Sequence, residues 1–76
     1  MDCNNVKPNL RVKTNAKLGK TDGMTIKEKH LDVRKPEVTG TVLNYVPGHG
    51  GDVWFVKHDD SEDVGAYCFD EFEPIA

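Results

Sequence analysis

Histidine and carboxylate side chains, the types that bind metal ions or transfer protons, gather in two turns of the sequence. His49 and Asp52 lie among glycines, and His58 is followed at once by Asp59 and Asp60. Imidazole and carboxylate groups are ordinary ligands of zinc and manganese. Their spacing here matches no known ligand pattern. We therefore interpret these histidines as surface residues in turns, and we expect no metal and no cofactor.

The acidic run 59–63 contains several oxygen ligands of the kind that calcium prefers. It lacks the glycine and the distal glutamate of an EF-hand loop, so a solvated turn is the better interpretation. Acid–base catalysis would need a buried carboxyl group with a raised pKa, and a polar turn does not provide that environment. The sequence contains no Ser–His–Asp or Cys–His context and no phosphate-binding glycine motif. These observations favour a noncatalytic protein.

The elements that must position these residues lie between Gly40 and Ile75, a stretch that contains every aromatic residue of the chain. Runs of β-branched and aromatic residues predict strands over 40–46, 52–58 and 64–69. The Gly- and Pro-rich run 47–52 and the polar run 59–63 predict the turns between them. Residues 70–75 predict one helical turn that leads into a terminal strand, because Pro74 cannot continue a helix.

The chain of 76 residues predicts a single domain. We expect a flexible start at 1–9, a first strand at 10–14, a long loop or arm at 15–37, and a strand meander with a closing turn at 38–76. Within the arm, residues 24–35 are ambiguous. Thr25 to Glu28 fits a helix-capping box, whereas Leu31 and Val33 alternate with charged residues as in a strand. We predict an extended arm or hairpin there.

The strand predicted at 52–58 has two apolar faces. Successive side chains point to opposite faces of a sheet, which separates Trp54, Val56 and His58 from Val53, Phe55 and Lys57. A small isolated sheet should expose one face to solvent. Because both faces of this strand are apolar, either the arm or a second copy of the chain covers the second apolar face. A domain of this size buries only about 60% of its unfolded surface, which favours self-association.

Charge divides the chain into a basic and an acidic half. Residues 1–39 hold nine Lys or Arg against five acids, a net charge of +4, and residues 40–76 hold one Lys against eight acids, a net charge of −7. Either the arm packs on the acidic half of its own chain or it meets the acidic half of the next copy. A basic arm also suits a polyanion. An acidic domain would repel a phosphate backbone, so we do not expect nucleic-acid binding.

The cysteines and the hydropathy indicate a cellular location. Cys3 and Cys68 have neither metal-site nor redox-motif spacing, and we expect free thiols in a reducing cytosol. No apolar run approaches the roughly 18 residues of a membrane span, and the start of the chain has no signal-peptide pattern. We expect a cytoplasmic protein of bacterial type with no membrane partner.

Several runs resemble a Src-homology-3-like small barrel of the KOW or Tudor-like layout. They are LRVK at 10–13, GTV at 40–42, VWFVKHDD at 53–60 and DEFEPI at 70–75, together with Tyr67. The resemblance implies an all-β fold, a five-stranded barrel with a long first loop and a short helical turn before the last strand. It also implies two possible functions, methylated Lys or Arg recognition in an aromatic cage, and nucleic-acid binding as in KOW-like domains.

A second resemblance concerns Val64 to Tyr67, which ends eight residues before Ile75. The plasmid-borne type II dihydrofolate reductases carry Val-Gln-Ile-Tyr at this distance and assemble as tetramers around one central pore. In that family the Gln and Ile contact folate and nicotinamide. Here Val64 and Tyr67 match, whereas Gly65 and Ala66 do not. The resemblance implies an alternative function, a small-molecule or reductase-like site at the centre of an oligomer.

The aromatic residues are the best candidates for a recognition surface. We assign Trp54 and Phe72 to the core, and we favour core and interface roles over a cage for the others. The predicted contact residues are Tyr45, Phe55, Tyr67 and Phe69, with a charged rim of Lys27, Lys29, Arg34 and Lys35. The predicted function is a small noncatalytic binding or assembly module whose partner is another protein or a second copy of itself.

Overall fold

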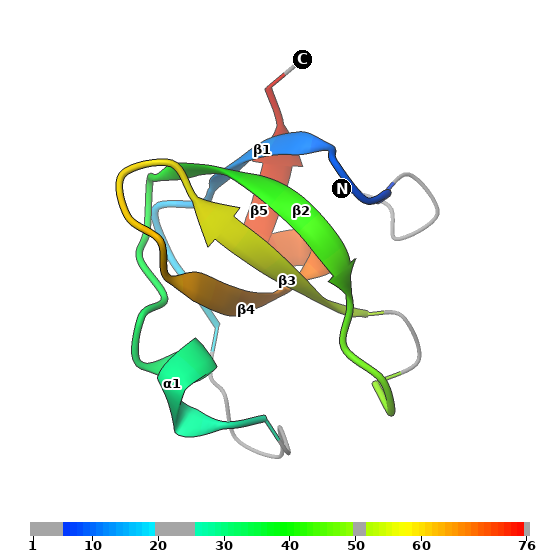
Figure 1. Ribbon diagram of the computed structural model, residues 1–76. Helices are drawn as coiled ribbons and strands as arrows, with labels where there is room; N and C mark the ends of the chain where they lie inside the picture. Colours follow the sequence, from blue (N-terminus) through cyan, green and yellow to red (C-terminus); the bar gives the residue numbers. More distant parts are fainter. Residues whose placement is uncertain (1–5, 20–25, 50–51, 76) are drawn as a thin grey trace.

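The computed structural model describes residues 6–19, 26–49 and 52–75. Five strands form one antiparallel sheet in the order β4-β3-β2-β1-β5 (Figure 1). In chain order the elements are β1 (Arg11–Thr14), α1 (Glu28–Leu31), β2 (Thr39–Tyr45), β3 (Val53–His58), β4 (Val64–Cys68), the 3-10 turn η2 (Phe69–Glu71) and β5 (Phe72–Pro74). The predicted all-β class, the strand meander and the helical turn before the last strand are confirmed. The layout is compatible with a Src-homology-3-like fold.

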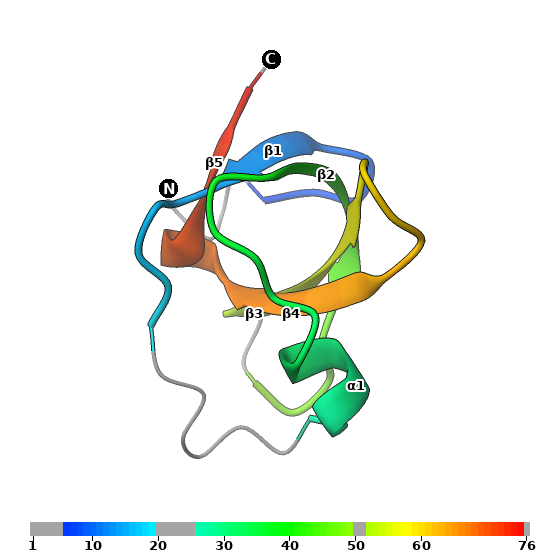
Figure 2. The same ribbon diagram turned by 90° about the vertical axis from the view of Figure 1, so that its left-hand side faces the viewer.

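The sheet curves strongly, as Figure 2 shows, but it is not closed into a barrel. β5 pairs with β1, β4 pairs with β3, and within the described ranges no ladder joins the edge strands β4 and β5. The η2 turn carries the chain from one edge to the other. β5 is only three residues long and ends at Pro74, which has no backbone N–H to donate to a further ladder. In this respect the expectation of a barrel is corrected to an open, curved sheet.

A bulge in β2 sets which rings meet at one end of the sheet. Val42 lies opposite Val56, but Tyr45 lies opposite Trp54, so β2 holds one extra residue between these pairs. At the other end of the same pair of strands Gly40 faces β3, and a Cβ there would lie 2.6 Å from the carbonyl oxygen of Lys57. The close approach of the two strands therefore requires glycine at position 40.

Apolar side chains pack on both faces of the sheet. The inner cluster comprises Val6, Val12, Val42, Trp54, Val56, Tyr67 and Phe72. The outer cluster comprises Val46, Val53 and Ala66, with Phe55 and Cys68 packed against it. The alternation of side chains along β3 and the assignment of Trp54 and Phe72 to the core are confirmed. Val6 is buried in the inner cluster, and the Asn9 N–H donates to the Val42 carbonyl, so residues 6–9 pack on the sheet rather than extending freely.

The arm covers the outer face of the sheet. Ile26 and Leu31 pack against the outer cluster, and α1 lies beside β4 in Figures 1 and 2. The interpretation that the arm covers the second apolar face is therefore confirmed. The prediction of an extended arm or hairpin is wrong at Glu28–Leu31, which form the single helical turn α1, because the packing of its apolar Leu31 against the sheet stabilises a turn that would be marginal alone. Thr25, the first residue of the predicted capping box, lies outside the described residues.

None of the helices in the part of the chain that the structure describes is long and apolar enough to cross a membrane.

Candidate functional site

The four rings predicted to form one contact surface lie in different environments. Tyr45 is 52% exposed and packs edge-on against Trp54, with 6.0 Å between ring centroids. Phe69 is half-buried against the inner cluster. Phe55 points to the outer face, where its centroid lies 4.8 Å from that of His30, and Tyr67 is completely buried. The prediction of one four-ring surface is wrong, because strand alternation sends Phe55 and Tyr67 to opposite faces.

The four basic residues predicted to form a charged rim also lie in different environments. Lys27 and Lys29 are exposed beside and on α1, as expected of a rim. The Lys35 ammonium lies 4.0 Å from the Asp60 carboxylate. Arg34 turns inward and forms a buried ion pair with Glu71, with only 5% and 6% of the two side chains exposed. Arg34 therefore belongs to the interior and not to a contact surface.

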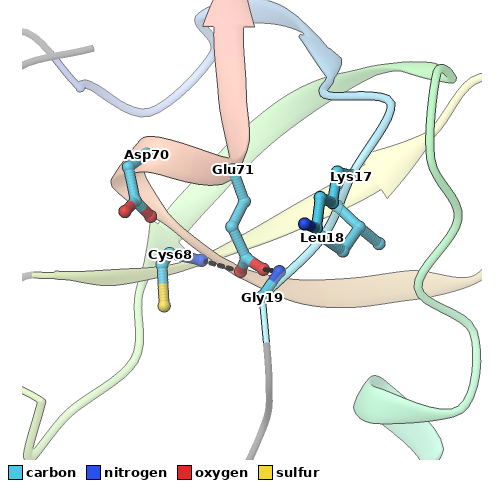
Figure 3. A pocket seen from close by; sticks show the side chains of 6 residues that line it. All are labelled: Lys17, Leu18, Gly19, Cys68, Asp70 and Glu71. Atoms are coloured by element: carbon cyan, nitrogen blue, oxygen red, sulfur yellow. Dashed lines mark hydrogen bonds between the residues drawn. The ribbon is translucent and has the colours of Figure 1, made fainter.

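Glu71 joins three separate segments of the chain. Its carboxylate accepts hydrogen bonds from the Arg34 guanidinium in the arm, from the Gly19 N–H in the first loop, and from the Cys68 N–H at the end of β4. Figure 3 shows Glu71 reaching between Gly19 and Cys68, with both backbone bonds drawn. Bonds to these three donors use both oxygens of the carboxylate. Glu71 is therefore a structural residue that holds the first loop and the arm against the sheet.

Tyr67 and His58 form a second buried network beside this ion pair. His58 Nδ1 lies 3.0 Å from the Asp63 carbonyl oxygen, which can only accept, so Nδ1 carries a proton. In the neutral ring Nε2 then accepts from the Tyr67 hydroxyl, 2.7 Å away. The same hydroxyl accepts from the Lys35 N–H at 2.7 Å. The Arg34 guanidinium carbon lies 5.3 Å from the Tyr67 ring centroid, and burial raises the pKa of Tyr67.

Position 65 has no space for a side chain. A Cβ on Gly65 would lie 2.8 Å from the Tyr67 ring and 3.1 Å from the His58 ring. The type II reductase motif places Gln at this position, and Ala66, in place of its Ile, is buried in the outer cluster. The His58–Tyr67 contact thus excludes the Gln side chain that this family places at its pore.

A cavity of about 420 Å³ opens next to Glu71. Its lining residues are Lys17, Leu18, Gly19, Cys68, Asp70 and Glu71 (Figure 3). Cys68 is a free thiol, as predicted, and Cys3 lies outside the described residues. Burial, with a smaller contribution from Glu71, raises the pKa of Cys68 to about 11. The thiol therefore stays protonated at neutral pH and is a poor nucleophile.

Three ion pairs join the two charged halves of the chain within the molecule. Arg11 pairs with Asp59, Arg34 with Glu71, and Lys35 with Asp60, so each pair joins the basic half to the acidic half. Hydrogen bonds from Arg11, and then from Thr39, lower the pKa of Asp59 to about 2. The pairs of Arg34 and Lys35, both in the arm, confirm the interpretation that the arm packs on the acidic half of its own chain.

The histidine and carboxylate turns form no metal centre in the described ranges, where no three His, Cys, Asp or Glu side chains are placed to hold an ion. The prediction that His58 lies on the surface is wrong, since His58 is fully buried at the end of β3. His49 is half-buried in the loop after β2.

Comparisons with protein-family models, curated proteins and solved structures found no match. Sequence reasoning missed the Arg34–Glu71 pair, whose members are 37 residues apart. The opposite net charges of the two halves were the one sequence signal that pointed to it.

Proposed function

We propose that the protein is a noncatalytic binding or assembly module that contacts another protein, or a second copy of itself, through one end of its sheet. The observation that carries the proposal is the Tyr45 ring, half-exposed and supported by the buried ring of Trp54. A rigidly supported aromatic ring offers a large contact area at a low cost in side-chain entropy. Such rings are enriched among the residues that dominate binding energy in protein interfaces.

Phe69 extends this surface across the neighbouring strands. Its N–H donates to the Asp52 carbonyl at 2.8 Å, which continues the β3–β4 ladder by one pair beyond Val53 and Cys68. Phe69 follows Tyr67 by two residues, so its ring lies on the same face of the sheet as Trp54. We define Tyr45, Trp54 and Phe69 as the sheet-end surface.

The chemistry of the buried polar residues supports a noncatalytic role. Glu71, His58 and Tyr67 are all bonded to other parts of the fold. Cys68, with its pKa near 11, does not supply a thiolate. Proton transfer by Glu71 or Tyr67 would require these groups to give up the bonds that hold the arm.

The order of elements agrees with the Src-homology-3-like resemblance, and we include membership of that group of small domains in the proposal. Strand, long loop, three meandering strands, helical turn and last strand follow one another in the chain. The oligomeric reductase alternative gains less support, because it needs Tyr67 from several chains near one axis. Tyr67 is enclosed by its own chain, and its hydroxyl is bonded to Lys35 and His58.

A photo-reactive side chain at the exposed ring tests the proposal directly. We expect the Tyr45→benzoylphenylalanine protein to form a discrete crosslinked product, either with a partner or with a second copy. The matched control carries the same residue in place of Glu62, in the exposed turn after β3. Light scattering over a range of concentrations then distinguishes self-association from a mass constant at 8.5 kDa. Equal crosslinking from both positions would contradict a role for the sheet-end surface.

A further inference from the structure

We draw no further inference here: the strongest candidate, the cavity of about 420 Å³ beside Glu71 at the end of β4, carries nothing, because the Glu71 carboxylate is already bonded to its own chain, the Cys68 thiol is protonated at neutral pH, and the exposed Lys17 and Asp70 side chains, which are opposite in charge, select no class of ligand.

Discussion

The buried network around Glu71 and the sheet-end surface around Tyr45 use side chains in opposite ways. In the network, Arg34, Glu71 and Tyr67 are enclosed and direct their polar atoms to other parts of the same chain. At the sheet end, Tyr45 is half-exposed, and its ring packs edge-on against the buried Trp54 ring. The difference shows that the reactive residue types of this protein stabilise its fold. Tyr45, by contrast, is an aromatic residue that stays half-exposed at the surface.

The largest effect on stability should come from breaking the buried ion pair. Arg34→Ala leaves the Glu71 carboxylate buried without its cation, a situation that typically costs about 3–5 kcal/mol. We expect this loss in the free energy of unfolding, measured by urea denaturation with Trp54 fluorescence as the probe. The double variant Arg34→Met with Glu71→Gln should recover part of the loss, because it removes both charges. A change as small as that of the exposed Lys29→Ala control would show that the pair contributes little.

The next largest effect should come from filling the space beside Tyr67. Gly65→Ala places a methyl group 2.8 Å from the Tyr67 ring, and overpacking of this kind costs about 1–3 kcal/mol. Thermal unfolding followed by circular dichroism measures the cost, with Glu62→Ala in the adjacent exposed turn as the control. A Gly65→Ala protein as stable as this control would mean that the Tyr67 and His58 rings make room for the methyl group at no cost in stability.

A smaller effect should appear in acid. The hydrogen bonds of Arg11 hold the pKa of Asp59 at about 2, below its ordinary value of 3.8. The unfolded chain therefore binds this proton more readily, so the contribution of Asp59 to stability is present above pH 4 and is lost as the pH falls toward 2. Urea denaturation of the wild type and of Asp59→Asn at several pH values isolates this contribution. Parallel pH profiles for the two proteins would contradict it.

The smallest effect on stability should come from the sheet-end surface, although its effect on binding should be the largest. Tyr45→Ala removes a half-exposed ring and should lower the free energy of unfolding by less than about 1 kcal/mol. The same change should abolish the crosslink or association that Tyr45 mediates. Denaturation and light scattering on one preparation measure both quantities. A large loss of stability with unchanged association would reverse the roles assigned to the two regions.

Strand positions and the pairing of faces could be predicted from the sequence because they depend on local chemistry. β-Branched and aromatic runs mark β2, β3 and β4, and the alternation along Val53–His58 predicted which side chains share a face. Pro74 and the polar turn after β3 marked where elements end. These signals involve neighbouring residues, so they are readable without knowing how the chain folds back on itself.

Tertiary structure alone decided the roles of the residues singled out for function. Arg34 meets Glu71 across 37 residues, and the Lys35 N–H meets the Tyr67 hydroxyl across 32. Spacing does not encode such contacts, since they depend on how the arm packs over the curved sheet. That packing turned Arg34 inward against Glu71 and bonded the Lys35 N–H to the Tyr67 hydroxyl, whereas Tyr45 stayed exposed. The sequence by itself determined a small antiparallel β domain with two apolar faces. Only the curvature of the sheet and the packing of the arm determined which of its side chains are buried and which are exposed.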